Sequence, residues 1–146
     1  MSADRLVALE RLEELERLQA YAFSAATFEI NDKASIVTNP LRGEGRQASD
    51  IAHELSHLIL EHELTEVREL SGVPFRTCRP EQEEEATALG GTLMLPRPLL
   101  LGAVRRGWGP EEIAEAYGVT EEMARFRYNS TGVAKQVRRG PGRSSA

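Results

Sequence analysis

Residues 46–63, RQASDIAHELSHLILEHE, contain the pattern on which the interpretation of the whole chain depends. Within them, His53-Glu54-Leu55-Ser56-His57 has the order H-E-x-x-H. In a helix, His53 and His57 lie one turn apart on the same face, so both imidazoles can direct a nitrogen at one zinc ion, at about 2.0–2.1 Å each. Glu54 lies about 100° further round the helix, where it can hold a water molecule and accept its proton. The motif therefore predicts a metal site with a general base beside it.

The residues around the motif predict a helix. Four apolar residues recur at the spacing of one helical face: Ile51, Leu55, Leu58 and Ile59. Ser49 or Asp50 can cap the start, and neither Gly nor Pro occurs within 46–71. We expect this face to pack into the core. A surface helix with two unrelated histidines is the alternative, and it is disfavoured because all three histidines of the chain lie within 53–62.

Composition limits the class of protein. The chain has 146 residues, 40% of them hydrophobic, which suits one domain or one domain with a small appendage. A net charge of −5 argues against a general polyanion binder. The single cysteine, Cys78, excludes an internal disulfide. The sequence contains neither an apolar signal core at its N-terminus nor a membrane-spanning run, so we expect a soluble cytoplasmic protein.

Two segments precede the motif. Residues 4–23 contain good helix formers and neither Gly nor Pro. Their leucines recur every third residue, at Leu6, Leu9, Leu12, Leu15 and Leu18, so they wind round a helix that needs contacts on more than one side. We expect this helix to lie over the domain, with a dimer contact as the alternative. Residues 27–38 read as a β-hairpin that turns at Asn31-Asp32-Lys33, and 39–45 as a loop.

The second strand of that hairpin, 34–38, is a candidate for substrate binding. It directly precedes the metal helix, and extended peptides often bind by adding a strand to a sheet edge. We therefore expect Ile36 and Thr38 to contact substrate.

A third metal ligand is expected from the helix predicted at 81–96, which follows an irregular segment at 71–80. A zinc site built on H-E-x-x-H needs a further His or Glu. The face that approaches the first helix is marked by small and apolar residues, namely Ala86, Gly90 and Leu93. Glu83 shares that face, so it is favoured as the ligand, with Glu84 next. The cost of Gly90-Gly91 in a helix, about 1 kcal/mol each, is explained by close helix approach.

These motifs together resemble the ImmA/IrrE family of zinc metallopeptidases. The matching pieces are Ile36-Val37-Thr38-Asn39, Arg46-Gln47, Ala52-His53-Glu54-Leu55-Ser56-His57, Glu83-Glu84-Glu85-Ala86 and Leu93-Met94-Leu95-Pro96. The resemblance covers about residues 30–96 and depends on the order and spacing of several pieces. Three positions depart from the family pattern, with Ser56 for Gly, Ser49 for Phe and Leu89-Gly90 for Phe-Ala, and none of them removes a ligand.

The resemblance implies metal ligation by His53, His57 and Glu83, with Glu54 as general base. Zinc is the expected metal, and Mn²⁺ or Fe²⁺ also suits this ligand set. The implied activity is that of an endopeptidase acting on an intracellular regulatory protein, such as a helix-turn-helix repressor, in stress or mobile-element control. The alternative is a non-catalytic, metal-containing module that acts through its helical unit on DNA or on a regulator.

Several residues keep alternative roles. His62 follows His57 by five residues and is a less favoured ligand, and Cys78 is a candidate resting-state ligand that more often serves as a small hydrophobe. The oxyanion that forms during hydrolysis needs a hydrogen-bond donor. Tyr117, Arg127 and Tyr128 are the candidates, and Tyr128 is also expected near the substrate.

The C-terminal part reads as a second, helical unit. Helices are expected at 98–106, 110–117 and 121–128, and the last two resemble a helix-turn-helix with a tight turn at 118–120. Glu121 and Glu122 at the start of the last helix disfavour DNA binding, although Arg125 and Arg127 partly offset them.

The predicted fold is thus α+β and mainly helical. It comprises a zincin-like metallopeptidase core with a small antiparallel sheet at 1–96, a helix-turn-helix-like unit at 97–130 and a flexible basic tail at 131–146.

Overall fold

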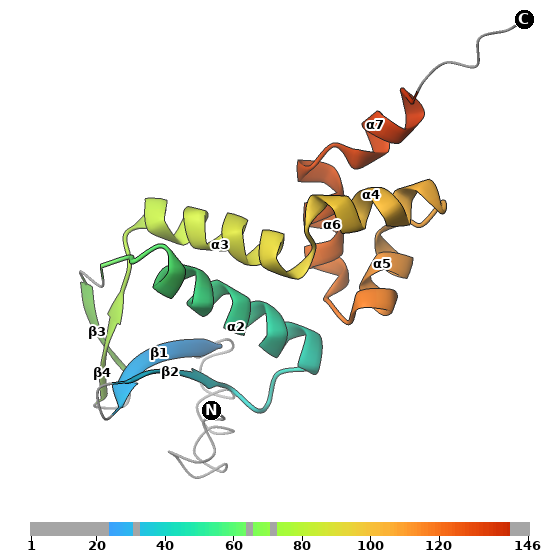
Figure 1. The fold of residues 1–146 in the computed structure, drawn as a ribbon. Coiled ribbons are helices and arrows are strands. Elements are labelled where there is room, and N and C mark those ends of the chain that lie inside the picture. Colours follow the sequence, from blue (N-terminus) through green and yellow to red (C-terminus); the bar gives the residue numbers. More distant parts are fainter. Residues whose placement is uncertain (1–23, 31–32, 64–65, 71–72, 141–146) are drawn as a thin grey trace, which may run out of the picture. The chain divides into compact units, whose positions relative to one another are not determined.

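The computed structural model describes residues 24–30, 33–63, 66–70 and 73–140 (Figure 1). The chain divides into two compact units, Met1–Gly90 and Gly91–Ala146. The described elements are helices and two separate two-stranded antiparallel sheets, so the fold is α+β and mainly helical, as predicted. The helix expected at 4–23, with its alternative dimer contact, lies outside the described residues.

In the first unit, the predicted hairpin is confirmed. Strand β1 (Ala25–Ile30) pairs with β2 (Lys33–Thr38) in a register that runs from Ala25 opposite Thr38 to Ile30 opposite Lys33. Both strands contact helix α2 (Glu44–Ile59). The loop between β2 and α2 is ordered by Asn39, which is 1% exposed. Its Oδ1 accepts a hydrogen bond from the Leu41 amide, and its own amide donates to Ser24 O at 2.9 Å.

Helix α2 differs from the prediction at its start. Its N-cap is Gly43, so neither Ser49 nor Asp50 caps it. Ser49 lies inside the helix, where its hydroxyl donates to Gly45 O at 3.2 Å. Asp50 forms an ion pair with Arg46 one turn earlier.

The apolar face of α2 also corrects the prediction. The four residues expected to pack into the core, Ile51, Leu55, Leu58 and Ile59, are 39–53% exposed. The buried residues of this helix are Asp50, Ala52, Ser56 and His57, which lie on a different side. Small side chains on that side allow another helix to approach the histidines. The buried face of α2 therefore forms part of the candidate site and contributes little to the hydrophobic core.

A second hairpin was missed. Along the chain, strands β3 (Glu66–Leu70) and β4 (Val73–Thr77) lie between α2 and helix α3 (Pro80–Met94), and they pair with each other. Residues 71–80 had been predicted to be irregular. Pro74 suggested a loop because proline has no N–H to donate within a sheet. Both strands of a two-stranded hairpin are edge strands, however, and proline is tolerated there.

The close approach predicted at Gly90 is present. A Cβ placed there would meet backbone atoms of Ala52 and His53 at 3.2 Å, so a side chain at this point would force α3 and α2 slightly apart. Ala86 on α3 is fully buried. Leu93, expected on the same face, is 45% exposed, because the helices touch near Gly90 and Leu93 lies almost a full turn further on.

The second unit contains helices α4 (Arg97–Arg105), α5 (Pro110–Tyr117), α6 (Glu121–Ser130) and α7 (Val133–Arg138). Their core residues are Leu95, Leu100, Ala103, Ile113, Val119, Ala124 and Val133. The two helices and the tight turn predicted for a helix-turn-helix are present as α5 and α6. Gly118 ends α5 with φ of +65°, and the Thr120 hydroxyl caps α6 by accepting from the Met123 amide at 3.2 Å.

The predicted domain limits differ from the structure at two places. The division falls after Gly90, whereas the boundary was predicted after residue 96. The tail predicted to be flexible from 131 instead contains α7, because Val133 is fully buried in the core of the second unit. The basic, Gly-rich composition of this stretch gave no sign that Val133 would be buried.

No single helix in the described ranges is long and apolar enough to cross a membrane, although α3 and α4 together, with a bend between them, meet the length and composition criteria.

Candidate metal centre

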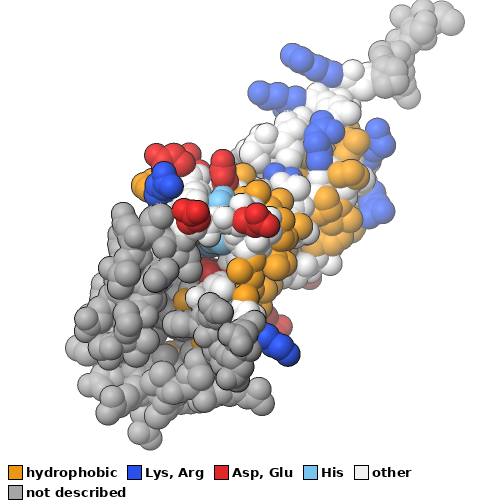
Figure 2. Space-filling view, turned by 60° about the vertical axis from the view of Figure 1, so that its left-hand side comes forward, with side chains coloured by type: hydrophobic (Ala, Val, Ile, Leu, Met, Phe, Trp, Pro, Cys, Tyr) orange, Lys and Arg blue, Asp and Glu red, His pale blue; other side chains and the backbone are white. Residues whose placement is uncertain are grey.

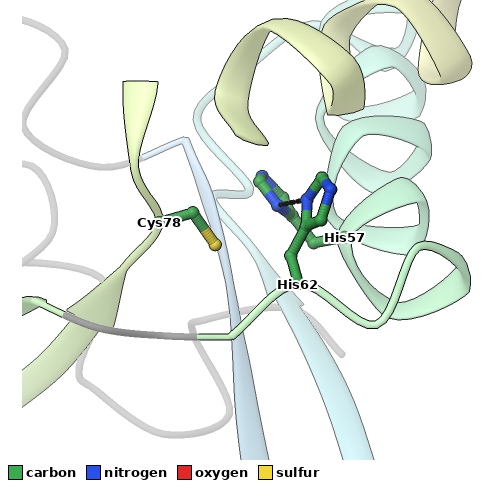
Figure 3. Close-up of side chains that lie close together, drawn as sticks. All are labelled: His57, His62 and Cys78. Carbon is green, nitrogen blue, oxygen red and sulfur yellow. Dashed lines mark hydrogen bonds between the residues drawn. The ribbon is translucent and has the colours of Figure 1, made fainter. Parts of the chain in front are cut away.

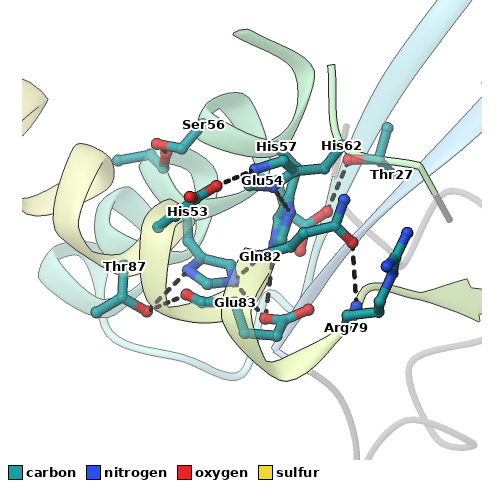
Figure 4. A network of polar contacts seen from close by, with 12 residues as sticks. Thr27, His53, Glu54, Ser56, His57, His62, Arg79, Gln82, Glu83 and Thr87 are labelled. Carbon is teal, nitrogen blue, oxygen red and sulfur yellow. Dashed lines mark hydrogen bonds and ion pairs between the residues drawn. The ribbon is translucent and has the colours of Figure 1, made fainter. Parts of the chain in front are cut away.

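Three side chains from α2 and α3 converge in the first unit (Figure 4). The Nε2 atoms of His53 and His57 are 3.1 Å apart. Glu83 Oε2 lies 3.0 Å from His53 Nε2 and 3.5 Å from His57 Nε2. Ligand atoms at the corners of a tetrahedron, each about 2.0–2.1 Å from a central ion, are separated by roughly 3.3–3.4 Å. The separations observed for these three atoms therefore fit one metal ion with a fourth position left for another ligand.

The position of Glu83 follows from the start of α3. This helix begins at Pro80, so Glu83 lies in its first turn, and the Gly90 contact holds the same helix against α2. Glu84, the second candidate, is exposed and belongs to neither group of residues arranged for a metal. Glu85 is also exposed, and its carboxylate contacts His62. Of the three consecutive glutamates, the structure brings Glu83 to the two histidines.

Glu54 lies beside this group with its carboxylate half-buried. The Thr27 hydroxyl of β1 donates to Glu54 Oε2 at 2.7 Å, which holds the carboxylate in place. Burial raises the pKa of Glu54 above its usual value, the hydrogen bond from Thr27 and the nearby His53 oppose the rise, and Glu83 adds to it. A raised carboxyl pKa makes Glu54 a stronger base than an exposed glutamate, which suits proton transfer near neutral pH.

The surroundings of His57 favour its neutral form. Burial chiefly lowers the pKa of the His57 imidazole, and the neighbouring His53 and His62 lower it further, whereas Glu83 opposes them. A neutral imidazole keeps a lone pair available on one nitrogen, as a metal ligand requires. The lowered pKa of His57 therefore agrees with its position as a metal ligand beside His53 and Glu83.

The outward-facing ring nitrogens of the two histidines have different neighbours. His53 Nδ1 has a long contact of 3.5 Å with the hydroxyl of Thr87, which itself donates to Glu83 O at 2.9 Å. His57 Nδ1 lies 2.9 Å from His62 Nδ1, and His62 Nε2 lies 3.0 Å from Glu85 Oε2. His62 therefore contacts His57 and Glu85 and does not belong to the first group of ligands.

A second group with metal-binding donors shares one of these histidines (Figure 3). His57, His62 and Cys78 each offer a donor atom within 4.8 Å of the other two. Cys78 is 6% exposed. Burial raises the pKa of its thiol, and the nearby Glu83 and Glu54 raise it further, so the protonated form is favoured.

The site opens to solvent on one face. Figure 2 shows histidine at the surface with acidic side chains beside it. The His53 side chain is 29% exposed, whereas that of His57 is 9% exposed. The His53 side of the site is therefore the more exposed of the two.

The remaining predicted residues are distributed over both units. Ile36 is half-buried on β2 and Thr38, at the end of the strand, is 6% exposed. Tyr117 and Tyr128 pack against the core of the second unit. Arg127, also in that unit, is 8% exposed, and its Nε and Nη2 both donate to Leu95 O. This engagement makes Arg127 a structural residue more than a free donor for an oxyanion.

Sequence reasoning missed two polar contacts that support the site. Thr27 and Thr87 carry hydroxyls that contact Glu54 and His53, respectively. Thr87 lies four residues after Glu83, so helical spacing would have been enough to place it on the ligand face. No comparable signal in the sequence identified Thr27.

Comparison with known families supports the same interpretation. Residues 14–129 match the family model of peptidase M78, described as the IrrE N-terminal-like domain. This match supports an activity of the metallopeptidase type. No curated protein and no solved structure matches the chain significantly.

Proposed function

Because the chain belongs to the peptidase M78 family, with its IrrE N-terminal-like domain, we propose that it is a zinc-dependent endopeptidase that cleaves an intracellular regulatory protein. The observation that carries this proposal is the convergence of His53 Nε2, His57 Nε2 and Glu83 Oε2 at separations of 3.0–3.5 Å, with Glu54 beside them. A purely structural site has no need of a base next to the ligands.

The ligand set determines what the ion contributes. Two neutral imidazoles and one carboxylate leave a divalent cation with net positive charge and an open position. His53, His57 and Glu83 would hold the ion; bound zinc would supply a water of lowered pKa, about 7, and polarisation of a peptide carbonyl. Mn²⁺ and Fe²⁺ are compatible with the same donors.

Glu54 moves the protons in this proposal. Its carboxylate accepts the proton of the attacking water and later delivers it to the leaving amine nitrogen. The hydroxyl and the backbone of Thr27 both hydrogen-bond the Glu54 carboxylate and hold it beside the two histidines. Burial raises the pKa of Glu54, which helps the same group act first as a base and then as an acid.

For the substrate, we propose that an extended peptide lies along β2 by strand addition. Ile36 is the more accessible of the two candidate contact residues on this strand, since Thr38 is 6% exposed. The resemblance to the ImmA/IrrE family favours a helix-turn-helix repressor as the protein that is cleaved.

The test is a comparison of Glu54→Gln with the wild type on such a repressor. We expect Glu54→Gln to retain its zinc content and to lose about 10²–10⁴-fold in cleavage rate, the usual contribution of general acid–base catalysis. Glu84→Gln, which removes an exposed carboxylate from the same helix as Glu83, is the matched control and should cleave normally. Equal cleavage by Glu54→Gln and the wild type would refute the proposed mechanism.

The alternative is a non-catalytic regulatory module, and the capped α5–α6 pair is the observation in its favour. Glu121 and Glu122 at the exposed start of α6 disfavour DNA as the ligand, and Arg125 is paired with Glu121 on the same helix. If this alternative holds, Glu54→Gln will preserve regulation in the cell as well as zinc content.

A further inference from the structure

His62 is brought back towards the metal site by the way α2 ends. The helix stops at Ile59, and Glu61 adopts φ of +53°, in the left-handed region. The His62 amide then donates to His57 O at 3.0 Å, the six-to-one bond of a Schellman motif. The backbone therefore reverses so that the His62 ring returns to the ring of His57, with their centroids 5.1 Å apart.

The His62 side chain is 5% exposed and has a partner at each ring nitrogen. Its Nδ1 lies 2.9 Å from His57 Nδ1, and its Nε2 lies 3.0 Å from Glu85 Oε2 on α3. A buried imidazole that bridges one residue of α2 and one of α3 is well placed to hold them in register.

Only one arrangement of protons satisfies all these contacts around a metal. If His57 presents the Nε2 lone pair to an ion, its proton must be on Nδ1, and that N–H must donate to His62 Nδ1. His62 then carries its own proton on Nε2, which donates to the Glu85 carboxylate. In this arrangement each donor meets an acceptor.

We propose that His62 is a positioning residue that fixes the tautomer and orientation of His57 as a metal ligand, with Glu85 in turn fixing His62. This inference rests on the proposed metal site. Metal-bound histidines commonly donate their other N–H to a fixed acceptor, and loss of that acceptor weakens metal binding. The corresponding nitrogen of His53, Nδ1, has a longer contact of 3.5 Å with the Thr87 hydroxyl, so His57 is the more firmly oriented ligand.

The competing assignment is a second metal ion held by His57, His62 and Cys78. It is disfavoured because one imidazole can offer lone pairs from both nitrogens to two ions only after it loses its last proton. The hydrogen-bonded arrangement needs no such loss.

The test measures zinc affinity by competition with a chelator. His62→Leu removes the acceptor and should weaken zinc binding about 10–100-fold. His62→Gln places an amide oxygen near the His57 N–H and should recover most of the affinity, whereas a residue that only fills space would not be rescued in this way. Glu84→Gln is the control and should bind zinc normally. Wild-type affinity in His62→Leu would overturn the proposal.

Two further measurements keep the result decisive. If His62→Leu does not fold, Glu85→Ala at an exposed position breaks the outer contact and should still weaken zinc binding. Unchanged affinity would overturn the proposal.

With Co²⁺ in place of zinc, we expect one bound equivalent of metal and no thiolate-to-cobalt absorption band. A band that disappears in Cys78→Ser would establish the second site and overturn the proposal. Failure of the wild type to bind any metal would instead refute the proposed function.

Discussion

Substitution of Gly90 by alanine tests whether close packing of α3 on α2 assembles the metal site. In the structure, the added Cβ would lie 3.2 Å from the carbonyl carbon and oxygen of Ala52 and from the amide nitrogen of His53. These are backbone atoms within a helix, so they cannot move aside as a flexible side chain would. We therefore expect the α3 helix to shift by a few tenths of an ångström away from α2.

Two opposing effects set the magnitude. Replacing Gly by Ala inside a helix favours folding by about 0.5–1 kcal/mol. An extra methyl group in a tightly packed contact costs typically 1–3 kcal/mol. The net result for Gly90→Ala is a loss of about 1 kcal/mol in the free energy of unfolding. A shift of a few tenths of an ångström also exceeds the tolerance of about 0.2 Å in metal–ligand distances, so zinc affinity should fall by about tenfold.

Gly102→Ala is the matched control, since Gly102 lies within α4 and a Cβ there meets no atom within 4 Å. It should stabilise the protein by up to about 1 kcal/mol and leave zinc affinity unchanged. The assays are urea unfolding followed by circular dichroism and zinc titration against a chelator. If Gly90→Ala is as stable as Gly102→Ala and binds zinc like the wild type, the account of the helix contact is wrong.

Four other substitutions give separate tests. Thr27→Val removes the hydrogen bond that opposes the raised pKa of Glu54, so the acid limb of the pH–rate profile should move to higher pH while zinc affinity stays constant. Burial destabilises the charged form of Glu54 in the folded state, so metal-free Glu54→Gln should be more stable than the wild type at neutral pH, and urea unfolding should show this gap narrowing as the pH falls through the raised pKa of Glu54. Thr120→Ala removes the cap of α6 and should cost about 1 kcal/mol in urea unfolding without changing zinc affinity. Glu61→Gly relieves a left-handed non-glycine residue at the end of α2 and should stabilise the protein by about 1 kcal/mol in the same assay.

The parts of the fold that local chemistry determines were predictable from the sequence. Thr120 and Gly118 are residue types with fixed structural preferences at helix ends, so the α5–α6 turn was found at the right positions. Gly90 marked a close helix contact because its cost in a helix requires a compensating reason. The histidine pair and Glu83 follow from helical spacing, and the structure brings these three side chains together.

The wrong predictions concern features that depend on tertiary packing and not on local sequence. Helical periodicity identified the apolar face of α2 but not whether that face is covered, and Ile59 is 53% exposed. Pro74 concealed a strand because its effect depends on whether the strand edge is free. The contact between Thr27 and Glu54 joins residues 27 positions apart, and such a pairing depends on how β1 packs against α2.

The most direct test of the central claim is a crystal structure of the zinc-loaded protein, with anomalous diffraction at the zinc edge to locate the ion. The account predicts one ion at about 2.0–2.2 Å from the Nε2 atoms of His53 and His57 and from a carboxylate oxygen of Glu83, with Glu54 next to its open position. An ion bound by Cys78 and His62, or one without Glu83 among its ligands, would contradict it.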